Sequence, residues 1–159
     1  MKVIGIIGWK NSGKTFFAQE VIKQLTQKGI NVASIKRAHH DFDIDTPNTD
    51  SYLLRKAGSK QVIVSSSKRW AKITELDNKK EKKLEELLRE LTNTDVVIVE
   101  GFKKELHKKI EIINHSNENY LFNEIENVIA VVSDVKLNTS LPQFKKNEID
   151  LIVNFILKY

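Results

Sequence analysis

The sequence predicts one α/β domain over residues 1–159, with a doubly wound, mostly parallel sheet and helices on both faces of that sheet. Three observations predict this fold. An apolar, β-branched run at 2–8 opens the chain, an amphipathic segment follows at 14–29, and a second β-branched run follows at 31–36. Strand, helix and strand in this order form a βαβ unit, whose two strands run parallel.

The rest of the chain continues the alternation of strands and helices. Residues 38–50 are polar and contain Pro47, so we expect a long loop there, with Asp50 as the cap of the next helix. The run at 95–101 is almost entirely apolar, which is typical of a central buried strand. We expect the other strands at 61–66, 69–76, 109–113 and 127–133, and the other helices at 51–58, 79–92 and 147–158.

Composition excludes several classes of protein. There is no cysteine, so disulfides, thiolate metal sites and a cysteine nucleophile are all excluded. No segment approaches the ~20 apolar residues of a membrane-spanning helix, and the N-terminal apolar run lacks the pattern of a signal peptide. We therefore expect a cytoplasmic protein without a membrane partner. The net charge of +5 favours anionic partners without selecting one.

The octapeptide GWKNSGKT, between the first strand and the first helix, matches the phosphate-binding pattern G-x-x-x-x-G-K-[ST]. Glycines allow the backbone to curl so that its N–H groups point at phosphate oxygens. The lysine reaches the β- and γ-phosphates, the threonine hydroxyl binds Mg²⁺, and the helix N-terminus adds partial positive charge. The alternative is a glycine-containing turn. The expected nucleotide contacts are Gly8, Trp9, Lys10, Asn11, Ser12, Gly13, Lys14, Thr15 and Phe16.

A second Mg²⁺ ligand, beside Thr15, is expected from the strand at 95–101. Glu100 ends that strand, at the same edge of the sheet as the phosphate-binding loop. Asp95 begins the strand and is expected at the opposite edge. The alternative for Glu100 is a loop glutamate without a metal.

Residues 39–45, HHDFDID, combine two histidines and three aspartates. A calcium loop is excluded, because its sixth and twelfth positions are Thr46 and Tyr52 rather than Gly and Glu. A zinc site on the two histidines and a solvated acidic loop stay open as alternatives. The segment follows the carboxyl end of a strand, where ligands bind in open α/β sheets. The candidates for contacts to a second ligand or a partner are His39, His40, Asp41, Asp43 and Asp45.

The segment at 103–109, KKELHKK, is a further candidate for an anionic ligand, with Lys103 nearest to Glu100 in the sequence. A solvated basic loop is the alternative. Arg69 and Trp70 suggest a clamp for a flat anion, unless Trp70 belongs to the core.

Four stretches together resemble one family, the molybdopterin-guanine dinucleotide biosynthesis adapter proteins known as MobB. They are GWKNSGKT, the segments 39–58 and 61–76, and DVVIVEGFK with Lys-Ile-Glu at 109–111. The resemblance implies a dimeric, P-loop protein that binds GTP and Mg²⁺ and hydrolyses GTP weakly if at all. It also implies an adapter for the molybdenum cofactor guanylyltransferase, the enzyme that joins GMP to molybdopterin. The histidine and aspartate segment and Lys103 then become candidates for contacting the pterin or that enzyme.

The sequence departs from the family at two places near the second-ligand surface. Lys108 stands where the family often has proline, and residues 113–115 lack the arginine that the family tends to carry. The chain also lacks an N-K-x-D guanine signature, so Asp134, after the strand at 127–133, is the candidate for contacting the base.

Two other functions are alternatives to the adapter. A small-molecule kinase using ATP has an arginine-rich lid, whereas the four arginines of this chain are scattered at 37, 55, 69 and 89. A nucleic-acid-dependent ATPase shows a basic stripe with interleaved aromatic residues, and this sequence has no such stripe. We therefore expect no nucleic-acid partner.

Overall fold

The computed structural model describes residues 1–38, 41–76, 81–114 and 119–159, and it forms two compact units. The first unit comprises Met1–Arg37 and Leu84–Tyr159, and the second comprises Ala38–Lys83. One nucleotide-binding domain over residues 1–159 stays a prediction, and all the residues expected at the phosphates lie in the first unit. Within the ranges that the structure describes, no helix combines the length and the apolar character needed to cross a membrane.

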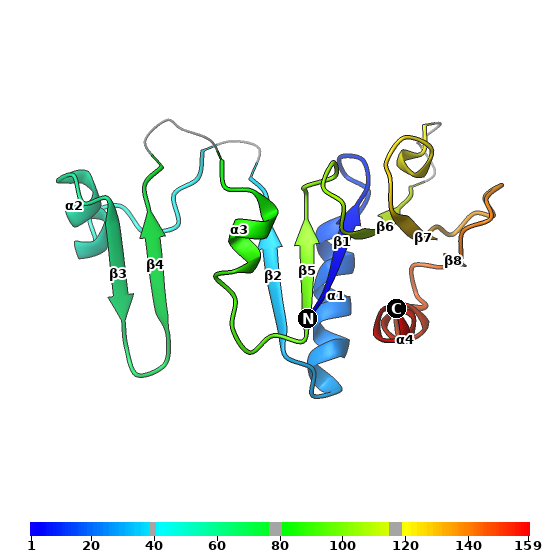
Figure 1. The fold of residues 1–159 in the computed structure, drawn as a ribbon, viewed down its shortest axis with the longest axis horizontal. Coiled ribbons are helices and arrows are strands. Elements are labelled where there is room, and N and C mark those ends of the chain that lie inside the picture. Colours follow the sequence, from blue (N-terminus) through cyan, green and yellow to red (C-terminus); the bar gives the residue numbers. More distant parts are fainter. Residues whose placement is uncertain (39–40, 77–80, 115–118) are drawn as a thin grey trace. The chain divides into compact units, whose positions relative to one another are not determined.

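The first unit is built on a six-stranded parallel sheet (Figure 1). Its strand order is β2-β5-β1-β6-β7-β8, and every neighbouring pair is parallel. Because β5 has neighbours on both sides, the prediction of a buried interior strand is confirmed. The strands are β1 (Lys2–Ile7), β2 (Val32–Lys36), β5 (Val96–Glu100), β6 (Lys108–Ile112), β7 (Val128–Val132) and β8 (Gln143–Phe144).

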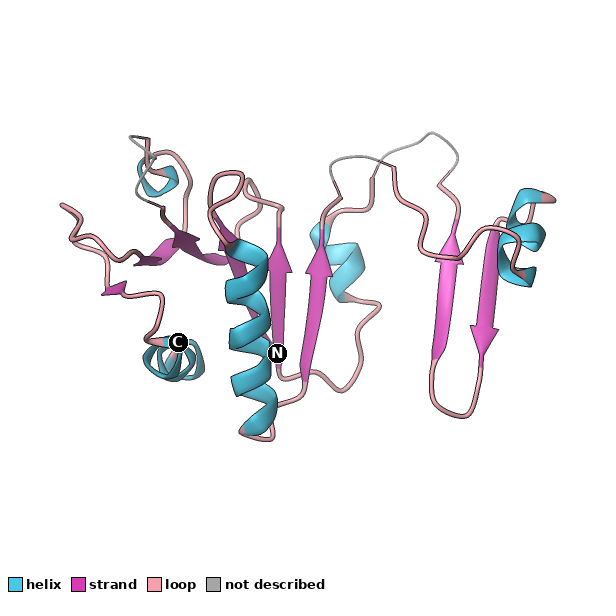
Figure 2. Cartoon of the chain, turned by 180° about the vertical axis from the view of Figure 1, so that it is seen from behind, coloured by secondary structure: helices cyan, strands magenta, loops and turns pink. Residues whose placement is uncertain are grey.

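Helices cover both faces of this sheet, as predicted. On one face, α1 (Lys14–Gln27) and α4 (Ile149–Lys158) pack against one set of alternate strand residues, including Ile4 and Ile98. On the other face, α3 (Leu84–Leu88) packs against the intervening residues, including Val97 and Val99. Figure 2 shows α1 in front of the strands when the sheet is viewed from behind. Because successive strand residues point to opposite faces, burial on both faces explains the unbroken apolar runs.

The helix predicted at 79–92 is shorter than expected. Residues 77–80 lie outside the described part, and the helix itself extends only over Leu84–Leu88. Lysines at 82 and 83 oppose the positive end of the helix dipole, and Asn93 has a left-handed backbone (φ +52°) that ends the segment. Leucines of this segment nevertheless face the core, since Leu84 is buried and Leu87, Leu88 and Leu91 pack beside it.

The second unit contains α2 (Asp50–Lys56) and an antiparallel hairpin of β3 (Gln61–Ser65) and β4 (Trp70–Thr74). The expectation of a single sheet is therefore wrong for these two strands, which form a sheet of their own. The reason is the short connection between them. Its ends are joined by a hydrogen bond from the Ser66 N–H to the Arg69 carbonyl, and a connection this short allows only antiparallel pairing.

The cap of α2 also differs from the prediction. Thr49 is the N-cap, and Asp50 is the first helical residue. The Thr49 hydroxyl donates to the Thr46 carbonyl at 2.7 Å, whereas the Asp50 carboxylate lies in the first turn, where negative charge is favourable.

Two buried charged side chains of β6 form hydrogen bonds with the chain segments that precede and follow this strand. Lys109 Nζ donates to the backbone carbonyls of Glu105 at 2.5 Å, His107 at 2.7 Å and Glu126 at 3.1 Å. The Glu111 carboxylate accepts the N–H groups of two residues of the 3₁₀ helix η1 (Leu121–Asn123), at 2.9 and 2.8 Å. Each buried charge thus has hydrogen-bond partners, which offset the cost of desolvation.

The half-buried His107 packs against β1. A Cβ at Gly5 would lie 2.5 Å from His107 Nε2, so glycine leaves the room that the ring occupies. Both ring nitrogens are buried without a hydrogen-bond partner among the described residues. Burial, together with the charge of Lys109, lowers the pKa of His107 to about 4.

Replacing Glu111 is expected to destabilise the fold in proportion to the hydrogen bonds lost. Glu111→Ala leaves two N–H groups unpaired and is expected to lower the free energy of unfolding by about 2–4 kcal/mol. Glu111→Gln keeps one acceptor oxygen, so a smaller loss is expected. Urea unfolding measures both variants, and equal losses in the two would contradict this role for the carboxylate.

His107 is expected to make stability fall in weakly acidic solution. The unfolded chain, with an imidazole pKa near 6.5, binds a proton more readily than the native state, where the pKa is about 4. The free energy of unfolding should therefore decrease as the pH falls from about 6.5 to 4, with no such change above that window. His107→Leu should remove this component. Carboxylates titrate in both the natural protein and His107→Leu, so the difference between the two stability–pH curves gives the contribution of His107. Parallel curves would refute this role of His107.

Candidate functional site

The predicted phosphate-binding loop lies at the carboxyl edge of the sheet, between the end of β1 and the start of α1. Its backbone has positive φ at Gly8 (+153°), Asn11 (+63°) and Gly13 (+90°). A Cβ at Gly8 would lie 2.5 Å from the Ile112 carbonyl oxygen and 2.6 Å from the Ser12 Oγ. Glycine at position 8 is thus required by the close approach of β6, and at position 13 by the left-handed backbone.

Lys14 bends back over this loop. Its Nζ donates to the Trp9 carbonyl at 2.6 Å, and the Ser12 N–H donates to the same oxygen at 3.2 Å. Burial lowers the pKa of Lys14; the nearby Glu100 carboxylate opposes this shift, whereas the charges of Lys103 and Lys36 add to it. The ammonium group of Lys14 therefore lies near other cations, and a bound anion would stabilise its charged form.

The two predicted metal ligands lie side by side. Thr15 Oγ1 donates to Glu100 at 3.2 Å from Oε1 and 3.3 Å from Oε2. Lys36 Nζ lies 3.8 Å from the same Oε1. Asp95 precedes β5 and therefore lies at the opposite edge of the sheet, as expected. There it accepts a hydrogen bond from the Asn31 N–H at 2.9 Å.

The chemistry of these groups fits Mg²⁺ only if the ion finds further oxygen ligands. In the parts of the chain that are described, no three His, Asp or Glu side chains gather closely enough to hold a metal ion. A hydroxyl and a single carboxylate suit an ion that takes its other ligands from phosphates and water, as Mg²⁺ commonly does.

Trp9 connects the loop to two later segments. Its indole N–H donates to the Asn119 carbonyl at 2.7 Å, and Lys103 Nζ lies 5.2 Å from the ring centroid. This contact brings Lys103, a candidate for the second ligand, beside the phosphate-binding loop.

The other expected nucleotide contacts differ in exposure. Ser12 is buried, and its Oγ has no hydrogen-bond partner among the described residues, whereas the Phe16 ring is 70% exposed on the first turn of α1. Lys10 and Asn11 are exposed on the loop. Asp134 follows β7 and is held by Lys146, whose N–H lies 3.2 Å from Oδ1 and whose Nζ lies 3.5 Å from Oδ2.

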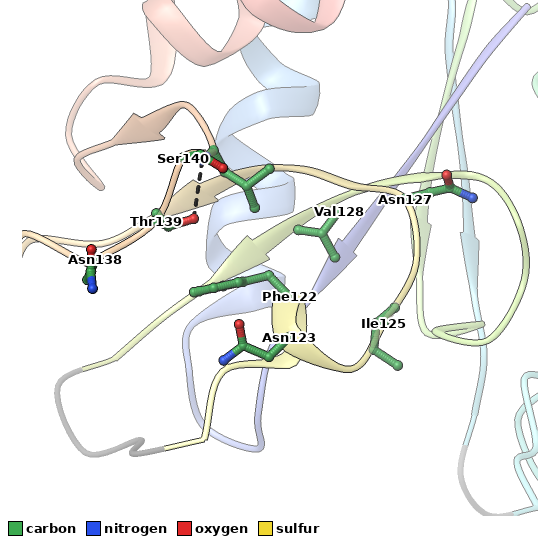
Figure 3. A pocket seen from close by; sticks show the side chains of 9 residues that line it. Phe122, Asn123, Ile125, Asn127, Val128, Asn138, Thr139 and Ser140 are labelled. Carbon is green, nitrogen blue, oxygen red and sulfur yellow. Dashed lines mark hydrogen bonds between the residues drawn. The ribbon is translucent and has the colours of Figure 1, made fainter.

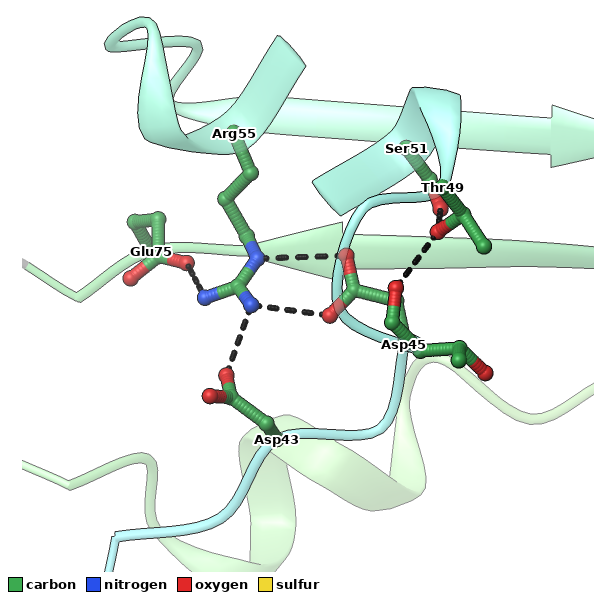
Figure 4. Close-up of polar contacts among 7 residues, drawn as sticks. Asp43, Asp45, Thr49, Ser51, Arg55 and Glu75 are labelled. Atoms are coloured by element: carbon green, nitrogen blue, oxygen red, sulfur yellow. Dashed lines mark hydrogen bonds and ion pairs between the residues drawn. The ribbon is translucent and has the colours of Figure 1, made fainter. Parts of the chain in front are cut away.

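In the second unit, Arg55 gathers three carboxylates (Figure 4). Its guanidinium lies 2.6 Å from Asp43, 2.8 Å from Asp45 and 2.9 Å from Glu75. These ion pairs give Asp43 and Asp45 a structural partner that the sequence analysis did not identify. Asp41 is exposed, and His39 and His40 lie outside the described residues.

The basic segment at 103–109 divides into buried and accessible residues. His107 and Lys109 are held in the fold as described above, so neither is available to an external anion, contrary to the expectation for the whole segment. Lys103 and the exposed Lys104 are accessible. Sequence reasoning missed the buried pair because a lysine and a histidine in a basic run give no signal of burial. Trp70 is 68% exposed on β4, so it is not a core residue.

One cavity of the first unit is lined by the residues drawn in Figure 3. Its volume is about 440 Å³. None of the residues expected at the nucleotide, the metal or the second ligand lines it. The lining is neutral and consists of Phe122, Asn123, Ile125, Asn127, Val128, Asn138, Thr139, Ser140 and Leu141.

Comparisons with known proteins agree on one family. The family model described as molybdopterin guanine dinucleotide synthesis protein B matches residues 3–134. The molybdopterin-guanine dinucleotide biosynthesis adapter protein of Escherichia coli (strain K12) is 36% identical over 163 residues, covering 99% of this chain and 92% of the relative. Its counterpart from Haemophilus influenzae is 35% identical, covering 97% and 86%.

A solved structure supports the same conclusion. The crystal structure of a molybdopterin-guanine biosynthesis protein B (mobB) superposes with a TM-score of 0.78 at 26% identity, covering 98% of both chains. The fold, the sequence relatives and the matched family model therefore agree, and the chain belongs to the MobB family.

Proposed function

We propose that this protein is a GTP-binding adapter that assists the attachment of GMP to molybdopterin. The relatives are named as adapter proteins of molybdopterin-guanine dinucleotide biosynthesis. The observation that carries the nucleotide part of the proposal is the contact of Thr15 with Glu100, directly beside Lys14. We assign no catalytic residue to this chain, so GTP hydrolysis is expected to be weak at most.

In the proposed complex, the N–H groups of residues 8–15 and the N-terminus of α1 bind the phosphates. Lys14 exchanges the Trp9 carbonyl for phosphate oxygens, and a bound triphosphate favours the charged form of this lysine. Thr15 and Glu100 would hold Mg²⁺, directly or through water, and the bound ion would neutralise part of the phosphate charge. No other residue of the chain is needed to explain binding of the phosphates.

Recognition of the base is assigned to Asp134. Guanine presents two adjacent N–H donors where adenine has an acceptor and a hydrogen atom, so a carboxylate favours guanine. Asp134 follows a strand of the same sheet and points its carboxylate toward Lys146, from which the base would release it. Phe16, exposed beside Thr15, offers an apolar surface to the nucleoside.

The partners that we propose are the molybdenum cofactor guanylyltransferase, molybdopterin and a second copy of this chain. Lys103, beside the loop, is the described candidate for contacting the pterin or the enzyme. The candidate surface for the homodimer is the second unit, where the hairpin and α2 expose large apolar side chains. A two-stranded sheet is marginal by itself, so a covering partner would stabilise it. These side chains are Leu53, Leu54, Ile63, Val64 and Trp70.

Lys14→Ala is expected to weaken GTP binding by at least about 30-fold, because a charge-assisted hydrogen bond to phosphate is lost. Titration calorimetry with GTP and with ATP, each with Mg²⁺, measures this change. Lys23→Ala is the matched control, since Lys23 lies on α1 and is mostly exposed. Stronger binding of ATP, or phosphate transfer to a small acceptor, would favour the kinase alternative, and unchanged GTP affinity in Lys14→Ala would refute the proposed site.

Ile63→Glu is expected to weaken the proposed dimer at least about tenfold, because the charge would be buried in an apolar interface. Sedimentation equilibrium measures the dimer dissociation constant. Leu151→Glu introduces the same charge at an exposed apolar position of α4 and should leave the constant unchanged. A monomeric natural protein would overturn the homodimer, and equal effects of the two variants would exclude the hairpin as its surface.

A further inference from the structure

Lys36 lies beside the candidate metal site, although no sequence motif includes it. It is the last residue of β2 and is opposite Glu100 in the parallel register of β2 and β5. The register is fixed just beyond this pair, because the Arg37 N–H donates to the Glu100 carbonyl at 2.8 Å. A Cβ at Gly101 would lie 2.6 Å from the Arg37 Cβ, so the two chain segments are also closely packed.

The ammonium group of Lys36 and the hydroxyl of Thr15 contact the same carboxylate. Lys36 Nζ lies 3.8 Å from Glu100 Oε1, and Thr15 Oγ1 lies 3.2 Å from that oxygen. The Lys36 side chain is 65% exposed, whereas that of Glu100 is only 20% exposed. The long lysine side chain can therefore move into solvent, but the carboxylate stays at the edge of the sheet.

An incoming cation meets unfavourable charge at this position. The charges of Lys36 and Lys103 both act on Lys14, and Lys36 is also paired with the single carboxylate of Glu100. A metal ion that binds between Thr15 and Glu100 must separate Lys36 from the carboxylate and approach Lys14. Phosphate oxygens would remove both obstacles, since they attract the ammonium groups and supply ligands to the metal.

We propose that Lys36 competes with the divalent cation for Glu100 and thereby makes metal binding depend on the phosphates of the nucleotide. This role rests on the proposed function, because it gives the same site a means of binding metal and nucleotide together. Coupling of this kind is reciprocal: the factor by which GTP strengthens metal binding equals the factor by which the metal strengthens GTP binding. Lys36 is therefore a positioning residue, and it determines how strongly GTP binding and metal binding reinforce each other.

The test uses Mn²⁺ as the probe and counts the free ion by electron paramagnetic resonance, first without nucleotide. Lys36→Met should bind Mn²⁺ about three- to tenfold more tightly than the natural protein, as expected for loss of an exposed competing charge. Lys36→Arg keeps the charge and should bind as weakly as the natural protein. Lys103→Met removes an ammonium group that has no contact with Glu100 and should change the affinity less than about twofold.

The second part of the test repeats the Mn²⁺ titrations with saturating GTP. GTP should strengthen Mn²⁺ binding less in Lys36→Met than in the natural protein. The reduction should equal the factor by which the substitution tightens Mn²⁺ binding without nucleotide. If Lys36→Met binds Mn²⁺ no more tightly than the natural protein does, the proposed competition is refuted. The same holds if neither protein binds Mn²⁺. An equal gain in Lys103→Met would overturn it as well, since it would show only a general charge effect. Failure of GTP to bind the natural protein would refute the proposed function, while the titrations without nucleotide still decide the role of Lys36.

Discussion

The parallel pairing of β1 with β5 is the constraint on which the candidate site depends. It sets Ile6 opposite Glu100, so that the loop after β1 and the end of β5 meet at one edge of the sheet. Thr15, in the first turn of α1, then reaches a carboxylate that lies 85 positions away in the sequence. The buried valines of β5 and the isoleucines of β1 maintain this register through burial on both faces. Apolar side chains thus set the register that brings Thr15 and Glu100 together.

Strand β6 shows how buried charged residues stabilise the fold. Lys109 and Glu111 lie on β6, one pairing with carbonyl groups and the other with N–H groups of the flanking segments. Both are fully buried and hydrogen-bonded, so they hold in place the segments that precede and follow β6. Through Asn119, which accepts the Trp9 indole N–H, the segment held by Glu111 also reaches the phosphate-binding loop.

The sequence predicted the first unit better than the second. Periodicity located β1, α1, β2, β5 and β7, because strands buried on both faces and amphipathic helices leave strong apolar patterns. It assigned β3 and β4 correctly as strands but not to their sheet, since their runs resemble those of the main sheet and only the short connection distinguishes them. The position of Glu100 at the end of its strand predicted that it lies beside Thr15, and the two side chains are in contact. The sequence could not identify the Arg55 ion pairs or the burial of His107 and Lys109, because those depend on tertiary contacts rather than on local patterns.

The two charged clusters differ in what a ligand can gain from them. The guanidinium of Arg55 already uses both of its terminal nitrogens and Nε on the carboxylates around it, so a ligand for Asp43 or Asp45 must first break ion pairs. At the candidate site, by contrast, Lys36 is paired with Glu100 at 3.8 Å, and the charges of Lys36 and Lys103 both act on Lys14. Lys14 is held only by a backbone carbonyl among its described hydrogen bonds. A nucleoside triphosphate with its metal still carries net negative charge, so in the proposed complex it would relieve the repulsion among the lysines and replace that carbonyl. The balance of charge, more than the presence of charged residues, therefore distinguishes the candidate binding site from a structural cluster in this chain.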